Sequence, residues 1–139
     1  MARILIAEDE AALREFVSRA LTHHGHDIVA VADGAEALAI LQKGEVFDLL
    51  LSDIVMPVMD GIALALKVTK DFPDLKVLMM TGYAAERQRA YNLEMLIHDV
   101  IAKPFTLDEI CGKVSDALTS EQAVLKPATT SDEGLRTKK

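Results

Sequence analysis

The sequence predicts an α/β fold in which five parallel strands form one sheet with helices on both faces. Apolar runs of strand length alternate along the chain with stretches in which apolar residues recur every three or four positions. The strand runs are rich in Val, Ile and Leu and do not alternate with polar residues, which indicates that both faces of the sheet are covered. Right-handed crossovers between such strands place helices on both sides of the sheet.

The first two strands and their helices have clear boundaries. Strands are expected at 4–7 and 28–32. Between them, an apolar stripe predicts a core-facing helix that ends at Gly25, a residue that readily takes the left-handed conformation of a helix C-terminus. The stripe consists of Leu13, Phe16, Val17, Ala20 and Leu21. A second helix is expected over 35–41 and is closed by Gly44.

The same alternation continues to the end of the fold. Further strands are expected to end at Ser52, Met80 and Ala102, and helices are expected over about 62–71 and 85–96. A last helix is expected to point a set of apolar residues inward. These residues are Leu107, Ile110, Cys111, Val114 and Leu118.

Length and composition indicate one domain followed by a tail. The chain has 139 residues, 50% of them hydrophobic, which is enough for a single core. Residues 119–139 contain few large apolar side chains and include Pro127 and Gly134, a composition typical of disorder. We therefore expect the domain over 1–118, with a tail that is either a partner-binding arm or a solvated end.

Charge and cysteine content exclude several classes of function. The formal charge of −7 and the pI near 5.0 argue against a nucleic-acid partner, whose phosphates attract basic surfaces. The single cysteine excludes a disulfide framework and suits a reducing compartment. Because the sequence contains neither a long apolar run nor a start that resembles a signal peptide, we expect no membrane insertion and a cytoplasmic location.

Polar residues that could form one site follow four of the predicted strands. Glu8 and Asp9 follow the first strand, Asp53 the third, Thr81 the fourth and Lys103 the fifth. The carboxyl ends of parallel strands meet at one edge of the sheet, where ligands bind. Three carboxylates suit a hard cation such as Mg²⁺, and an aspartate can carry a covalent phosphoryl group. Taken singly, each residue is more typical of an ordinary loop position, so the prediction rests on their joint placement.

Four short motifs have the order and spacing of a known family. They are Ile4-Leu-Ile-Ala-Glu-Asp9, Asp53-Ile-Val-Met-Pro-Val-Met-Asp-Gly61, Met80-Thr-Gly-Tyr83 and Lys103-Pro-Phe105. Through them the chain resembles the receiver domains of bacterial two-component response regulators over about residues 2–118. The resemblance implies a flavodoxin-like, doubly wound sheet with strand order 2-1-3-4-5 and five helices.

This resemblance implies the chemistry of the acidic residues. Asp53 would accept a phosphoryl group from the phosphohistidine of a histidine kinase or a histidine phosphotransfer protein. The side chains of Glu8, Asp9 and Asp53 would hold Mg²⁺ together with the backbone carbonyl of Val55. Transfer in such a site depends mainly on positioning and on the offset of negative charge.

The same resemblance implies the residues that bind and report the phosphoryl group. Thr81 and Lys103 would contact its oxygens, and the bond between Lys103 and Pro104 would be cis. The sequence departs from the usual pattern at Val100, where many receivers have a Tyr or Phe whose rotamer follows the threonine.

Output is therefore expected to depend more on the helix over 85–96. We place Arg87, Arg89, Tyr91 and Val100 on this output surface. The thin apolar stripe of the helix is what a mobile element would have, and a plain surface helix would look the same.

The residues at two motif positions predict that a phosphoryl group on Asp53 is long-lived. Val55 stands two positions after Asp53, and Tyr83 stands two positions after Thr81. One side chain is apolar and the other is bulky, so neither is suited to position an attacking water. We expect phosphorylated Asp53 to hydrolyse slowly.

A finer resemblance concerns residues 81–90 together with 100–105. These segments are similar to the CpdR group of alphaproteobacterial single-domain regulators. In that group the unphosphorylated form engages the ClpXP unfoldase-protease and primes it to degrade cell-cycle regulators, and phosphorylation blocks the engagement. The resemblance implies a proteolysis adaptor rather than an enzyme, with the ClpX unfoldase as partner and Asp53 unmodified in the active state.

Other functions stay open. One is a chemotaxis-type regulator that binds its partner when phosphorylated, or a phosphate sink that drains a kinase. Another is a phosphatase with an aspartyl nucleophile, although such enzymes usually have a second acid where Val55 stands. A nucleotide-binding α/β protein is disfavoured because no Gly-rich phosphate loop follows the first strand.

Overall fold

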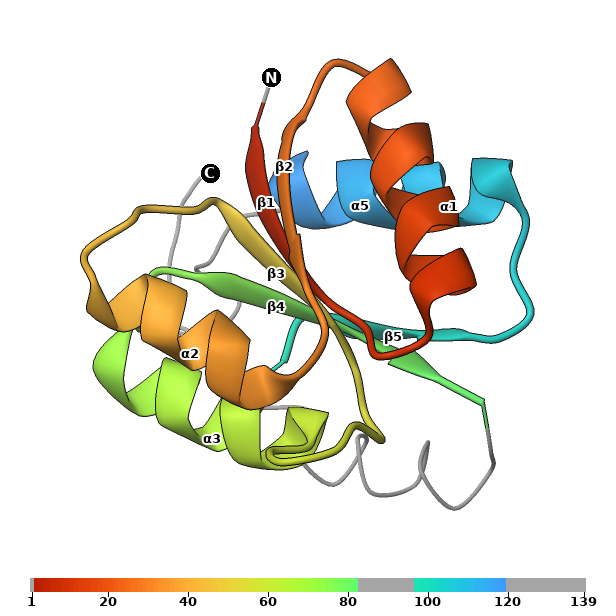
Figure 1. Ribbon diagram of the computed structural model, residues 1–139. Helices are drawn as coiled ribbons and strands as arrows, with labels where there is room; N and C mark the ends of the chain where they lie inside the picture. Colours follow the sequence, from red (N-terminus) through yellow and green to blue (C-terminus); the bar gives the residue numbers. More distant parts are fainter. Residues whose placement is uncertain (1, 83–96, 120–139) are drawn as a thin grey trace, which may run out of the picture.

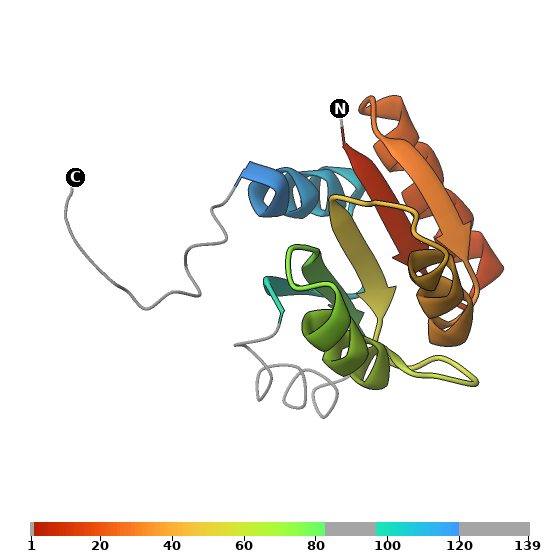
Figure 2. The same ribbon diagram turned by 90° about the vertical axis from the view of Figure 1, so that its left-hand side faces the viewer.

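The computed structural model describes residues 2–82 and 97–119, which form a parallel sheet between two layers of helices (Figures 1 and 2). The sheet has five strands in the order β2-β1-β3-β4-β5, so the predicted fold class is confirmed. The strands are β1 (Arg3–Ala7), β2 (Asp27–Val31), β3 (Leu49–Asp53), β4 (Lys76–Thr81) and β5 (Asp99–Ala102).

The helices cover the two faces of the sheet in pairs. Helix α1 (Ala11–His23) packs beside α5 (Leu107–Thr119), and α2 (Gly34–Gln42) packs beside α3 (Gly61–Asp71) (Figure 1). The helix expected over 85–96 lies outside the described residues. Helix α5 ends at Thr119, one residue beyond the expected domain boundary, and the rest of the expected tail also lies outside the described residues.

Two apolar clusters, one on each face, form the core. The cluster on the side of α2 and α3 includes Leu5, Leu50 and Met79, and the cluster on the side of α1 and α5 includes Ile4, Leu51 and Leu78. Successive residues of a strand point to opposite faces, which explains why an unbroken apolar run is needed in β1, β3 and β4.

Two expectations about burial are wrong. Strand β2 is only partly buried, because it is an edge strand of the sheet and has a neighbour on one side alone. Phe16 and Leu107, which were placed on inward helix stripes, are exposed. Helical spacing defines a stripe only to within about one residue on either side, and in α5 it is Ala117 that is buried.

The helix ends follow the expected chemistry. Gly25 and Gly44 have φ angles of 92° and 96°, so both take the left-handed conformation predicted for them. Asp33 and Asp60 cap α2 and α3, since their carboxylates accept hydrogen bonds from backbone N–H groups in the first turn at 2.9 Å.

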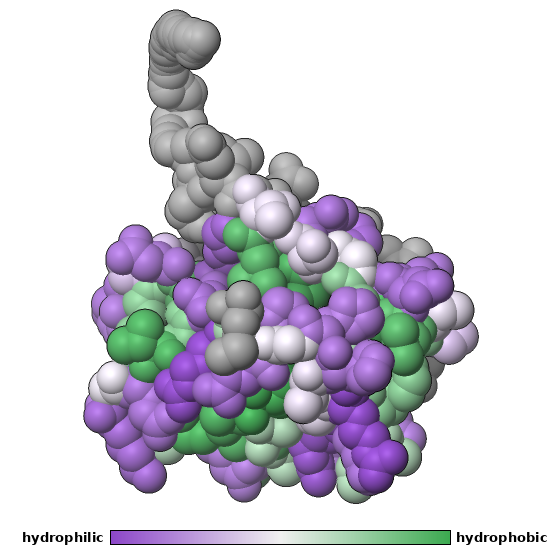
Figure 3. Space-filling model, turned by 90° about the horizontal axis from the view of Figure 1, so that it is seen from above, coloured by the Kyte–Doolittle hydropathy of each residue, from purple (hydrophilic) through white to green (hydrophobic). Residues whose placement is uncertain are grey.

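The surface is a mosaic of polar and apolar areas. Figure 3 views the molecule from above relative to Figure 1 and shows hydrophobic areas separated by hydrophilic ones. Among the helices that the structure describes, none has both the length and the apolar character required to cross a membrane.

Gly61 fixes the start of α3 against the end of β3. Its N–H donates to the Ile54 carbonyl oxygen at 2.7 Å, and a Cβ at this position would lie 2.1 Å from the carbonyl oxygen of Asp53. The close neighbours are backbone atoms, which cannot rotate away as a flexible side chain would. A glycine is therefore required here, where the chain passes close to the backbone of the candidate phosphoacceptor Asp53.

We expect Gly61→Ala to lower the free energy of unfolding by about 1–3 kcal/mol, the usual cost of overpacking. Gly112→Ala is the matched control, because a Cβ at Gly112 in α5 meets nothing within 4 Å. That control should be neutral or stabilising by up to about 1 kcal/mol, since alanine is the better helix former. Urea unfolding measures both, and equal stability of the two variants would contradict the close contact at Gly61.

Candidate functional site

The predicted side chains converge at the carboxyl edge of the sheet. Asp53 and Thr81 are the last residues of β3 and β4, and Glu8 and Lys103 directly follow β1 and β5. In the sheet Asp53 pairs with Met80, and Thr81 pairs with Ala102. The sheet order therefore puts β3, which carries Asp53, between the strands that carry the acid pair and the threonine.

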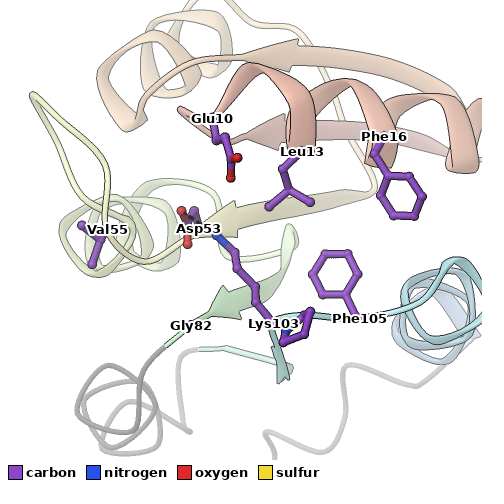
Figure 4. Close-up of a pocket in the computed structure, with 9 residues that line it drawn as sticks. Glu10, Leu13, Phe16, Asp53, Val55, Gly82, Lys103 and Phe105 are labelled. Carbon is purple, nitrogen blue, oxygen red and sulfur yellow. Dashed lines mark ion pairs between the residues drawn. The ribbon is translucent and has the colours of Figure 1, made fainter.

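Lys103 joins two of the acids. Its Nζ lies 3.0 Å from Oδ2 of Asp53 (Figure 4) and 3.3 Å from Oε1 of Glu8. The backbone N–H of Lys103 donates to the carbonyl oxygen of Thr81 at 2.7 Å, so the end of β4 holds the start of the loop that follows β5. The Lys103–Pro104 peptide bond is cis, in agreement with the resemblance.

Backbone groups orient the carboxylates. The N–H of Ile54 donates to Oδ1 of Asp53 at 2.9 Å, and the N–H of Glu10 donates to Oε2 of Glu8 at 2.9 Å. The guanidinium of Arg14 in α1 donates to the Glu8 carbonyl oxygen at 2.8 Å. Each buried carboxylate thus has one oxygen held by the backbone and one that faces Lys103.

Glu8, Asp9 and Asp53 form an acidic cluster that suits a hard cation. Each offers a carboxylate oxygen, and these atoms lie within 4.8 Å of one another. Glu8 is 1% exposed and Asp53 is 5% exposed, whereas Asp9 is exposed to solvent. Two buried carboxylates and a third beside them carry more negative charge than Lys103 alone offsets, and an all-oxygen donor set is the kind that Mg²⁺ binds.

Burial perturbs the protonation of the cluster. It raises the pKa of the Glu8 and Asp53 carboxyls, because each carboxylate has lost its water, and neighbouring carboxylate charges act in the same direction. The charge and hydrogen bonds of Lys103 partly oppose this rise. Burial by itself lowers the pKa of Lys103, but its contacts with Asp53 and Glu8 outweigh it, so the pKa of Lys103 is raised and the group is an ammonium at neutral pH.

These shifts link the stability of the fold to pH. A carboxyl whose pKa is higher in the folded than in the unfolded state stabilises the fold below the unfolded pKa, and this contribution is lost as pH rises through the folded value. Glu8 and Asp53 therefore oppose folding at neutral pH. A bound cation would offset that effect, since it favours the charged forms.

A cavity of about 620 Å³ opens above Asp53. Its apolar wall consists of Leu13 and Phe16 from α1 and Phe105 from the loop after β5, while Val55 lies on the other side of Asp53 (Figure 4). The remaining lining residues are Glu10, Gly82, Lys103 and Pro104.

Sequence reasoning missed this wall because Leu13 and Phe16 fit an ordinary core stripe. The signal that could have found it is Phe105, which directly follows the lysine and proline of the last motif.

The expected output surface is only partly described. Val100 is 7% exposed and belongs to the core cluster on the side of α2 and α3, so this side chain is buried and not on the surface itself. Arg87, Arg89 and Tyr91, together with Tyr83, lie outside the described residues.

Known proteins are similar to this chain in sequence and in fold. A family model described as a response regulator receiver domain matches residues 4–115. The response regulator receiver protein CpdR of Brucella abortus is 41% identical over 118 residues, which cover 85% of this chain and 98% of that protein.

Two solved structures agree with the fold. The response regulator TrrA of Thermotoga maritima, in complex with Mg²⁺ and BeF, is 31% identical with a TM-score of 0.76, and the match covers 85% of this chain and 100% of that one. The chemotaxis response regulator CheY4 of Vibrio cholerae is 29% identical with a TM-score of 0.77, over 85% of this chain and 99% of that one. This chain belongs to the response regulator receiver domain family.

Proposed function

We propose that this chain is a single-domain response regulator in which Asp53 accepts a phosphoryl group from the phosphohistidine of a histidine kinase or a histidine phosphotransfer protein. The observation that carries this proposal is the contact of 3.0 Å between Lys103 Nζ and Asp53 Oδ2, beside two further carboxylates. An ammonium at this distance can offset the charge of a group that arrives on the aspartate.

Mg²⁺ is the proposed cofactor, held by Glu8, Asp9, Asp53 and the carbonyl of Val55. The cluster of oxygens supports this assignment, and so does the likeness to a receiver that was crystallised with Mg²⁺ and BeF. When bound, the ion neutralises part of the charge that gathers around the transferred group.

The chain itself supplies the nucleophile and the binding groups. A carboxylate oxygen of Asp53 forms the new bond to phosphorus while the bond from phosphorus to the donor imidazole breaks. Lys103 and the hydroxyl of Thr81 bind the equatorial oxygens as this happens. We propose no turnover of a separate substrate: the chain accepts one phosphoryl group and loses it slowly.

The output we propose is regulated protein binding in the cytoplasm. The likeness to CpdR along nearly the whole of that protein supports an adaptor that engages the ClpX unfoldase and primes cell-cycle proteolysis while Asp53 is unmodified. The added charge at a buried site beside Lys103 would shift the equilibrium between two surface states. A chemotaxis-type regulator, active when phosphorylated, is the alternative, and the likeness to CheY4 favours it.

Incubation with acetyl phosphate and Mg²⁺ should add one phosphoryl group, detected by intact-protein mass spectrometry. Asp53→Asn should remove the adduct completely, since the amide is a poor nucleophile, and chelation of the metal with EDTA should remove most of it. Beryllofluoride with Mg²⁺ should bind at Asp53 and block its labelling by acetyl phosphate. An adduct of equal yield in Asp53→Asn would place the phosphoryl group elsewhere and refute the proposal.

Val55→Asn should shorten the lifetime of the phosphorylated form. Val55 is 52% exposed and lines the cavity above Asp53, and an amide at this position can orient an attacking water. We expect loss of label to be on the order of tenfold faster, which corresponds to about 1.4 kcal/mol in the barrier. The control is Val46→Asn, an exposed valine that does not line this cavity. An unchanged lifetime in Val55→Asn would count against the assigned role of Val55.

Capture of purified ClpX separates the two output models. Immobilised wild-type protein and Asp53→Ala should both retain the unfoldase, and beryllofluoride with Mg²⁺ should release it from wild type alone. Capture that appears only after beryllofluoride treatment would support the chemotaxis-type alternative. Absence of capture in every state would exclude the adaptor.

A further inference from the structure

A second cavity, of about 240 Å³, lies at the opposite edge of the sheet from Asp53, where β3 and β4 begin. The end of α2 and the loop before β3 form one wall, and the loop between α3 and β4 forms the other. Both walls are apolar and include residues of the core cluster on the side of α2 and α3. We call this cavity the amino-edge groove, and its large apolar residues are Leu41, Val46, Phe47, Phe72 and Leu75.

Contacts within the domain hold both walls in place. The guanidinium of Arg3 donates to the carbonyl oxygen of Val46 at 3.0 Å and lies 4.4 Å from the centre of the Phe47 ring. On the other wall, the N–H of Leu75 donates to the carbonyl oxygen of Phe72 at 3.0 Å. Because Arg3 binds the backbone of Val46, the valine side chain stays on the surface, and the residue is 76% exposed. The groove is therefore formed in the free protein, as binding sites for apolar groups usually are.

The last turn of α5 ends beside this groove. The ammonium of Lys76 donates to the carbonyl oxygen of Ala117 at 2.8 Å, and Lys76 directly follows Leu75, which lines the groove (Figure 2). The chain continues from Thr119, the end of α5, into residues 120–139. An extended segment of about five residues spans about 16 Å. The groove is thus within reach of the first part of this tail.

One short segment of the tail has the chemistry that the groove requires. Val124 and Leu125 are adjacent large apolar residues, and Lys126 follows them directly. Among the residues that line the groove, Asp74 is an exposed acid. An apolar pair followed by a cation therefore matches apolar walls with an acid at their edge.

We propose that the tail segment of Val124, Leu125 and Lys126 docks in the amino-edge groove of the same molecule. The apolar pair packs against the walls and covers Val46, and the lysine pairs with Asp74. Burial of the apolar side chains drives the contact. The tether to α5 gives the segment an effective concentration of about a millimolar at the groove, so a contact that is weak between separate molecules suffices. The docked arm leaves the phosphoacceptor site open, and the inference does not rest on phosphorylation.

The test of this contact is Leu125→Asp in the full chain. Aspartate removes an apolar side chain from the groove and is repelled by Asp74. We expect Tm to fall by about 3–6 °C, because the folded domain loses a segment that binds only to the folded state. In two-dimensional NMR spectra, the backbone amide resonances of Val46, Phe47 and Leu75 should shift.

Leu135→Asp is the matched control, since it makes the same change of residue and charge farther along the same tail. It should change neither Tm nor the groove resonances. Val46→Asp tests the contact from the side of the groove. It should lower Tm by a similar amount in the wild-type background and by much less when Leu125→Asp is already present, because residues in contact do not contribute additively.

Four outcomes would overturn the docked arm. Unchanged groove resonances in Leu125→Asp, or equal effects of Leu125→Asp and Leu135→Asp, would show that the segment does not occupy the groove. Additive losses of Tm in the double variant with Val46→Asp would show the same. Groove resonances that depend on protein concentration in wild type would assign the groove to the tail of a second copy. If Leu125→Asp leaves the groove resonances unchanged and Val46→Asp abolishes capture of ClpX, the groove belongs to the output partner.

Discussion

The arrangement of this molecule depends on two like charges that are buried at neighbouring strand ends and face one ammonium. Glu8 and Asp53 are nearly inaccessible, and Lys103 contacts both at 3.3 and 3.0 Å. Buried charges are stable only when they are paired, and a single lysine cannot neutralise two carboxylates and the adjoining Asp9. The site is thus short of positive charge, which makes it receptive to a cation. With a cation bound, the site would also suit the anionic phosphoryl group that we propose for Asp53.

The fold maintains this cluster because the groups that hold it belong to the sheet and the first helix. Ile54 orients Asp53, the Thr81 carbonyl holds the backbone of Lys103, and Arg14 of α1 holds the carbonyl of Glu8. The contacts of Asp53 at the end of β3 therefore lead to the ends of β1, β4 and β5 and to helix α1. That is the structural requirement for a modification at one residue to alter a surface elsewhere.

The parallel strands and the acidic site could be predicted from patterns that are local in sequence, whereas the order of the strands came from the resemblance to receiver domains. Unbroken apolar runs specify buried strands, and a polar residue directly after such a run must lie at the carboxyl edge. Burial at the margins could not be predicted in this way. Phe16 and Leu107 fit helical stripes but are exposed, and Val100 lies in the core because of its place in β5. Which residue of a broad stripe faces solvent depends on neighbours that are distant in sequence.

The rim of the site is where stability and function diverge most clearly. Around Asp53 the chain places apolar groups in solvent on both sides, with Phe16 on α1 and Val55 on the loop before α3. Isolated exposed apolar residues are common and need no explanation. Here, however, they flank the buried carboxylate of Asp53. A second surface that covers this rim would remove the exposed side chains from water, so the free protein has the features expected of one half of an interface.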